Sequence, residues 1–171
     1  MIVFENDFLD LKIDEKNVLI AHIKENSCDN SYIQESINQM IEGIRNIYIS
    51  YQKINKPLGL LFDARNLSQI LPISSIWNIA KFFGGTKDIT EEIVVGSAII
   101  TSSDIVITLV NAFSKLYQNV KPMKFSKDIE EGYSFLYDLF ENINSEDVNN
   151  NEIMDISDVN NLVDKYIHEG S

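Results

Sequence analysis

The chain has 171 residues, of which 44% are hydrophobic and 23% charged, and its formal net charge is −12 at pH 7. These totals predict one globular domain with a short extension, and they argue against nucleic-acid binding, which needs clustered Lys and Arg. No apolar run approaches the ~20 residues that cross a bilayer, and the first residues do not form a signal peptide. Together with the single cysteine, Cys28, this predicts a cytoplasmic protein without a disulfide bond.

The chain opens with two runs that are typical of strands. Apolar and polar side chains alternate over residues 8–14, and a second run covers 17–24 after the polar turn DEKN, so we expect a hairpin. Ile, Met and Tyr then recur every three or four residues over 31–54. This spacing predicts a long helix, capped by Asn30 or Ser31 and ended by the sequence NKP.

Three strand–helix pairs are expected after that helix. Residues 58–64 and 92–101 are continuously apolar, as strands covered on both faces are, and 121–126 is short and extended. The helices that follow these strands are expected over 72–85, from a cap at Ser102 or Ser103 to Leu116, and over 126–140. We expect the first of them to begin at Pro72 and to stop at the glycine pair GG.

The resulting order, β-β-α-β-α-β-α-β-α, predicts an α/β fold. Its central sheet is expected to be mixed and mostly parallel, with helices packed against it and the opening hairpin as an antiparallel edge. We assign residues 1–141 to this domain, 142–155 to an Asn-rich acidic linker, and 156–169 to a short amphipathic helix. That helix is too short to be stable alone, so it docks on its own domain, engages a partner or stays frayed.

Two stretches carry a resemblance to a known family. In FDARNLSQI a strand ends in an acid and leads into a loop of the pattern DxRxLS, matched by Asp63, Arg65, Leu67 and Ser68. In KPMKFSKDIEEGYSFL an extended P-x-x-F segment leads into an acid-rich helix. Over about residues 4–140 the chain resembles STAS domains, the fold of bacterial anti-sigma-factor antagonists. It is most similar to small STAS-like proteins that are related in pattern to lipid-binding CRAL-TRIO domains.

The chain departs from this family at the start of the second helix. Antagonists that are switched by phosphorylation carry an Asp-Ser-Ser-Gly-like stretch there, whereas this chain has LPISSIW, with Ser74 and Ser75 but neither the Asp nor the Gly. The first turn of a helix tolerates a phosphate group because its N–H groups are free. Serines at such positions more often only cap the helix, so a phosphorylation switch is the less favoured interpretation.

Asp63 is the most prominent polar candidate. Ligands of open α/β sheets bind beyond the carboxyl ends of the strands, where Asp63 falls. The simpler interpretation is that its carboxylate accepts N–H groups of its own loop, with Arg65 as an ion-pair partner. His22 and His168 have no ligands at metal spacing around them, and Cys28 lies beside an acid that disfavours its thiolate. We therefore assign no catalytic residue, metal ion or cofactor.

Three hypotheses for function follow. The preferred one is a non-enzymatic STAS-like interaction or regulatory domain that binds a protein partner or forms a homodimer. Its candidate contact residues are Asp63, Arg65, Ser68, Ser74, Ser75 and Trp77. The alternative is a carrier or sensor of a small apolar or lipid-like ligand. Its pocket would lie between the second and third helices, near Trp77, Phe82, Phe83 and Phe113. A hydrolase or transferase that uses Asp63 is least favoured.

Overall fold

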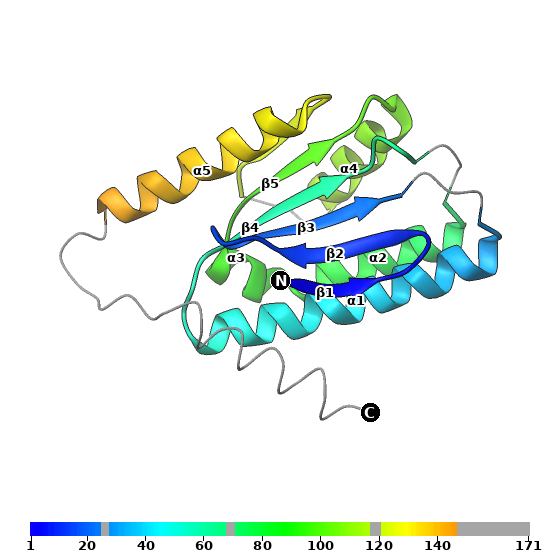
Figure 1. Cartoon of the computed structure of the whole chain (residues 1–171), viewed down its shortest axis with the longest axis horizontal. Coiled ribbons are helices and arrows are strands. Elements are labelled where there is room, and N and C mark those ends of the chain that lie inside the picture. The colour runs from blue at the N-terminus through cyan, green and yellow to red at the C-terminus, as the bar shows by residue number, and fades with distance from the viewer. Residues whose placement is uncertain (25–27, 68–70, 117–120, 147–171) are drawn as a thin grey trace.

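The computed structural model describes residues 1–24, 28–67, 71–116 and 121–146. Its strands are β1 (Ile2–Glu5), β2 (Leu9–Ile13), β3 (Val18–Ile23), β4 (Leu58–Asp63), β5 (Val94–Ile100) and β6 (Met123–Ser126). Its helices are α1 (Asn30–Lys53), α2 (Ile73–Gly85), α3 (Lys87–Ile93), α4 (Asp104–Leu116) and α5 (Ile129–Glu146). All six strands form one sheet in chain order (Figure 1). The first three pair antiparallel and β3 to β6 pair parallel, which confirms the predicted mixed, mostly parallel sheet.

The connecting helices share one face of the sheet, and α5 covers the other (Figure 1). Parallel strands that are added in one direction through right-handed crossovers place every connecting helix on the same side. Side chains of α1, α2 and α4 accordingly line one cavity with side chains of the sheet. On the opposite face Leu136 of α5 packs against Leu61 and Ala98. The molecule therefore has three layers, with the sheet in the middle.

Helix α1 supplies the largest part of the core. Its apolar stripe, which begins at Ile33 and ends at Tyr51, is buried against β2, β3 and β4. The helix approaches β2 closely at Gly43, where an added Cβ atom would lie 2.8 Å from Cδ2 of Leu11. Glycine allows this close approach, because a Cβ atom there would require the Leu11 side chain to shift.

The end of α1 is set by Asn55 before the proline is reached. Asn55 adopts a left-handed conformation with φ of 50°, which asparagine tolerates better than most residues. Its N–H group donates to the carbonyl of Gln52, and the N–H group of Lys56 donates to the carbonyl of Tyr51. These two bonds form a Schellman motif, which satisfies carbonyls at the helix end. Pro57 then follows the completed turn.

The structure corrects four details of the prediction. β1 and α3 were missed, and the cap of α1 is Asp29, whose side chain accepts the N–H group of Tyr32. Helix α5 continues to Glu146, so placing the linker at 142 was wrong for its first five residues. The rest of that linker and the predicted helix 156–169 lie outside the described residues. No helix within the described ranges is long and apolar enough to span a bilayer.

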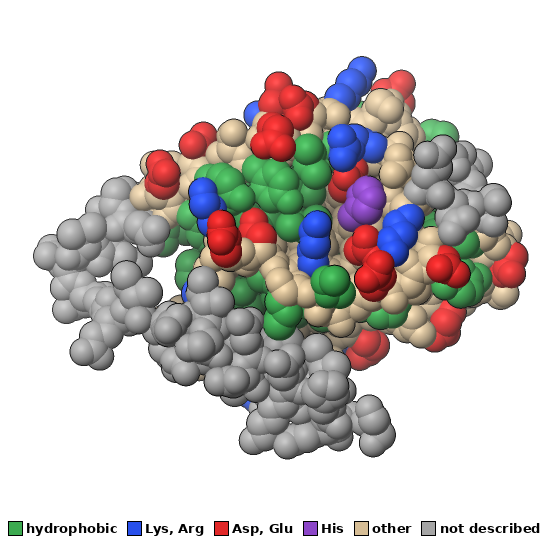
Figure 2. Space-filling view, viewed as in Figure 1, with side chains coloured by type: hydrophobic (Ala, Val, Ile, Leu, Met, Phe, Trp, Pro, Cys, Tyr) green, Lys and Arg blue, Asp and Glu red, His purple; other side chains and the backbone are tan. Residues whose placement is uncertain are grey.

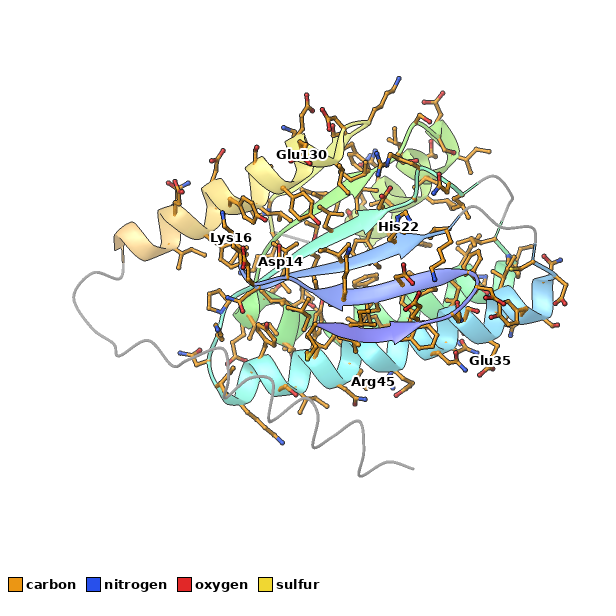
Figure 3. All side chains as sticks on the ribbon, in the orientation of Figure 1. Asp14, Lys16, His22, Glu35, Arg45 and Glu130 are labelled. Carbon is orange, nitrogen blue, oxygen red and sulfur yellow. The ribbon has the colours of Figure 1, made fainter. Side chains whose placement is uncertain are left out.

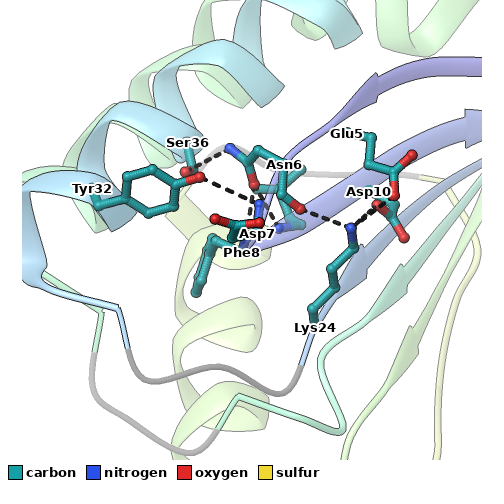
Figure 4. Close-up of polar contacts among 9 residues, drawn as sticks. Glu5, Asn6, Asp7, Phe8, Asp10, Lys24, Tyr32 and Ser36 are labelled. Atoms are coloured by element: carbon teal, nitrogen blue, oxygen red, sulfur yellow. Dashed lines mark hydrogen bonds and ion pairs between the residues drawn. The ribbon is translucent and has the colours of Figure 1, made fainter.

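Asn6 joins the turn between β1 and β2 to α1 (Figure 4). Its amide nitrogen donates to Oγ of Ser36 at 2.8 Å, and its side-chain oxygen accepts the N–H groups of Phe8 and Leu9, each at 2.9 Å. Its backbone carbonyl accepts from Nζ of Lys24 at 2.8 Å. One amide side chain thus shapes the turn and also fixes it to the helix.

We expect Asn6→Ala to lower the free energy of unfolding by about 1–3 kcal/mol, because two backbone donors and the Ser36 hydroxyl lose their partner. Chemical denaturation followed by circular dichroism measures this change. Asn111→Ala, at an exposed position of α4, is the matched control and should change stability by less than about 0.5 kcal/mol. Equal stability of the two variants would contradict the role of Asn6.

The turn between β2 and β3 is fixed to α5 on the other face (Figure 3). Oδ1 of Asp14 accepts the N–H groups of Lys16 and Val18, and the Tyr137 hydroxyl donates to Oδ2 of Asp14 at 3.2 Å. The Lys16 ammonium lies 3.9 Å from the centre of the Tyr137 ring, within reach of a cation–π contact. Burial and the nearby Asp14 carboxylate raise the pKa of Tyr137 to about 12.

Candidate functional site

Asp63 ends β4 and is the centre of a three-residue polar cluster with His22 and Arg65. Its side chain is only 1% exposed, and it lies in register with His22 of β3 and with Ile100 of β5. Nε and Nη2 of Arg65 donate to its two carboxylate oxygens at 2.9 and 2.7 Å, and Nδ1 of His22 lies 3.0 Å from Oδ2. Ile100 packs in the cluster on the α5 face, so the Asp63 carboxylate points to that face.

The cluster holds a loop in place and is poorly suited to proton transfer. Burial alone would raise the pKa of the Asp63 carboxyl, but the hydrogen bonds from Arg65 and His22 outweigh it and leave the pKa below its usual value. The same pairing raises the pKa of Arg65. The lowered pKa makes the carboxylate a weak base, and both of its oxygens already have hydrogen-bond partners. Figure 2 shows His22 at the surface among acidic and basic side chains.

The other predicted contact residues are spread over different environments. Ser68 lies outside the described residues. Ser74 is exposed and donates to Oε1 of Gln34 on α1 at 2.9 Å, whereas Ser75 is fully buried. The Ser74 side chain is therefore accessible from solvent, whereas the Ser75 side chain is not. Trp77 is 56% exposed on the outer side of α2. The structure brings Asp63 and Arg65 together and leaves the two serines and Trp77 apart from them.

Replacing Ser75 with alanine is expected to stabilise the protein. Its hydroxyl is buried, and it has no hydrogen-bond partner in the described structure. We expect Ser75→Ala to raise the free energy of unfolding by about 0.5–1 kcal/mol, because an unsatisfied hydroxyl is removed and alanine is the better helix former. Ser74→Ala, which removes an exposed hydrogen bond, serves as the comparison in the same denaturation experiment. A loss of stability in Ser75→Ala would show that the hydroxyl does have a partner.

A largely apolar cavity of about 340 Å³ lies between the sheet and the helices α2 and α4, and Asp63 is among the residues that border it, although its carboxylate points to the α5 face. Its floor is formed by side chains of β3, β4 and β5, including Leu60 and Ile99, and its walls by α2 and α4. Phe83 and Phe113, which the second hypothesis placed at its pocket, line this cavity. Phe82 instead packs in the core against Tyr48, with ring centroids 5.9 Å apart. The volume falls at the lower end of the range for small-molecule sites, about 300–1,000 Å³.

Helix α4 forms one wall of the cavity without closing it. The helix is rich in apolar residues, yet none of its residues from 104 to 115 is buried. Val106, Leu109, Val110 and Phe113 face the cavity and keep part of their surface accessible. Ser103 fixes the start of the helix, because its hydroxyl accepts the N–H group of Val106 and its carbonyl that of Ile107. This confirms the predicted cap. The helix is therefore fixed at its start, whereas none of the side chains from 104 to 115 on its apolar face is fully buried.

Comparisons with protein-family models, curated proteins and solved structures gave no match. Within the described ranges no group of three His, Cys, Asp or Glu side chains is arranged to hold a metal ion.

A second hollow, of about 640 Å³, lies between β1, α1 and α2. It is larger and more open than the cavity, and charged side chains surround it, among them Glu35, Glu42, Arg45 and Lys81. Small-molecule sites are mostly concave and apolar with few polar groups. The cavity beneath α4 therefore fits a small ligand better than this groove does.

Sequence reasoning missed several residues of this region. His22 was interpreted as a lone histidine, although it lies against Asp63. Ser97 and Met123 were treated only as parts of strands, yet both line the cavity. The signal that could have found Ser97 is its position as a polar residue within the apolar run IVVGSAII.

Proposed function

We propose that the protein binds a small apolar or lipid-like ligand in the cavity between α2, α4 and the sheet, as a carrier or a sensor. The observation that carries the proposal is that α4 turns an apolar face toward an apolar cavity and buries none of its side chains from 104 to 115. Apolar surface left accessible costs roughly 25 cal/mol for each Å². A ligand that fills the cavity removes this cost, so its binding is favourable.

The resemblance to STAS-like proteins and to lipid-binding CRAL-TRIO domains supports this proposal. On the sequence alone, protein interaction is the preferred hypothesis and ligand binding the alternative. The apolar cavity reverses this order. The polar cluster of Asp63 does not compete for this role, because its carboxylate lies on the other face with both oxygens occupied. A cytoplasmic location, which the single Cys28 suggests, is part of the proposal.

The test uses the full chain purified without detergent. We expect native mass spectrometry to show a bound apolar molecule that organic extraction removes. We also expect the extracted, refolded chain to bind an uncharged dye such as N-phenyl-naphthylamine with one site for each chain. A folded protein that carries no extra mass and binds no dye would overturn the proposal.

A second candidate function, binding of a protein partner or of a second copy of the chain, is favoured by a different observation. Ile73 and Trp77 lie one turn apart on α2 and are 74% and 56% exposed, and Ile105 of α4 is 60% exposed. Two large apolar side chains exposed on adjacent turns of one helix, as Ile73 and Trp77 are, form a candidate contact surface. Light scattering tests self-association. A dimer that Trp77→Ser converts to a monomer would support this function, whereas a monomer at all concentrations would exclude the homodimer.

A further inference from the structure

Ser97 is the least expected residue of the cavity. It belongs to β5, whose other residues are Val, Gly, Ala and Ile, and it is 8% exposed. It is paired with Leu60 of β4 and Met123 of β6 across the sheet, and all three residues line the cavity. No side-chain hydrogen bond joins Ser97 to another described residue, and its hydroxyl is not one of the fully buried polar atoms that lack a partner. The hydroxyl is therefore accessible from the cavity that Ser97 lines and is available to hydrogen-bond a ligand there.

A second hydroxyl lies near the same residues. Among the described residues, the Ser114 hydroxyl of α4 donates to Sδ of Met123, at 3.9 Å, and to no other acceptor. A thioether is a weak acceptor, so this contact leaves most of the capacity of the hydroxyl unused. Because Met123 is the neighbour of Ser97 on β6, the two serines mark one end of the cavity. The rest of the floor and walls is mainly aliphatic and aromatic. The cavity thus has a polar end and an apolar body.

The charge of the lining limits what the polar end can bind. Lys87 is the one cation among the described lining residues, and its ammonium already lies 3.6 Å from the Glu91 carboxylate. A carboxylate or phosphate that enters without a free cation loses its hydration and gains no ion pair, which costs several kcal/mol. The net charge of −12 further disfavours an anionic ligand. An uncharged polar group meets neither penalty.

We propose that the cavity selects an uncharged amphiphile, with an apolar body along α4 and one hydroxyl or carbonyl group that hydrogen-bonds to Ser97 and Ser114. This inference rests on the proposed function, since it names the chemical class of the ligand. The apolar body supplies most of the affinity, and the two serines set the orientation and the preference for a neutral polar group. Fatty alcohols, monoacylglycerols and similar neutral lipids belong to this class.

The test is displacement of the uncharged dye from the full chain at pH 7 by octane, octanol and octanoate, which differ only at one end. We expect octanol to displace the dye at lower concentration than octanoate. We also expect Ser97→Ala to lower the affinity for octanol relative to octane by about 3- to 10-fold, the effect of one net hydrogen bond. Ser114→Ala is the second variant and should act in the same direction. Ser50→Ala, which removes a buried serine that bonds to the Asn46 carbonyl within α1, should leave the ratio unchanged.

The outcomes separate the two levels of the proposal. If no compound displaces the dye or the dye does not bind, the proposed function fails. If octane and octanol bind but neither serine variant changes their ratio, the ligand binds without the polar end and the inference is wrong while the function stands. Preferential binding of octanoate would also overturn the inference, because the site would then hold an anion.

Discussion

Val110→Trp is expected to abolish ligand binding without loss of stability. Val110 lies on the inner side of α4 and lines the cavity, so an indole ring at this position occupies the space proposed for the ligand. Filling apolar space with apolar atoms stabilises a fold when no strain results. The free energy of unfolding should therefore stay equal or rise, while dye affinity falls by more than about 100-fold, which corresponds to ~3 kcal/mol. Dye titration and chemical denaturation measure the two quantities on the same sample.

Ala112→Trp provides the control for this experiment. Ala112 is exposed on the outer side of the same helix, so the same indole ring there should leave dye affinity unchanged. Loss of binding in both variants would mean that the dye responds to a general change of α4. Unchanged binding in Val110→Trp would show that the dye occupies another part of the surface, and the proposed cavity would be wrong.

Asp63→Asn is expected to produce the largest loss of stability. In the parent protein both carboxylate oxygens accept hydrogen bonds, from Arg65 and from His22. The amide of asparagine has only one oxygen, and its NH₂ group would face one of these donors instead of accepting from it. Hydrogen bonds to a charged group contribute about 1.5–3 kcal/mol each, so we expect a loss of about 2–4 kcal/mol at pH 7. Urea denaturation followed by circular dichroism measures this loss. Asp138→Asn, at an exposed position of α5, should cost less than about 0.5 kcal/mol.

The pH dependence of this loss has a defined sign. The pKa of Asp63 is lowered in the folded protein, so the folded state holds the ionised form more strongly than the unfolded chain does. Its contribution is complete above the unfolded pKa of about 3.9 and disappears as the pH falls through the lower folded value. The difference between the parent protein and Asp63→Asn should therefore be constant near pH 6–7 and shrink below about pH 4. A difference that is unchanged at pH 2 would contradict the carboxylate pairing.

The strands and helices with strong periodicity could be predicted from the sequence, and the two short elements could not. The predicted strand segments 58–64 and 92–101 contain β4 and β5, which pair in parallel and are largely buried, although residues 92–93 belong to α3. β1 has four residues, partly exposed at the sheet edge, and no alternation marks it. α3 has seven residues and follows α2 after Thr86 alone, without a side-chain cap. Elements this short depend on their tertiary neighbours more than on local preference.

The candidate site could be predicted only in part. The pairing of Asp63 with Arg65 follows from two residues of one loop, and the simpler interpretation of Asp63 is the one that the structure shows. The contact between His22 and Asp63 depends on the parallel register of β3 and β4. Neither strand's own sequence determines that register. The cavity is the space between α4 and the strands β4 and β5, because the side chains of α4 do not pack closely against these strands. The apolar stripe of α4 is the same whether it meets protein or ligand, so the sequence predicts the two helices but not the space between them.

The sheet in chain order has a consequence for how the chain is built. Each strand pairs with the one synthesised just before it, so no pairing waits for a strand that lies further along the chain, and the sheet can grow from β1 onward as the chain leaves the ribosome. β1 to β5 and α1 are synthesised before α4, and β6, which contributes Met123 to the cavity, is synthesised after it. The wall that α4 forms is therefore added to a sheet that lacks only its last strand.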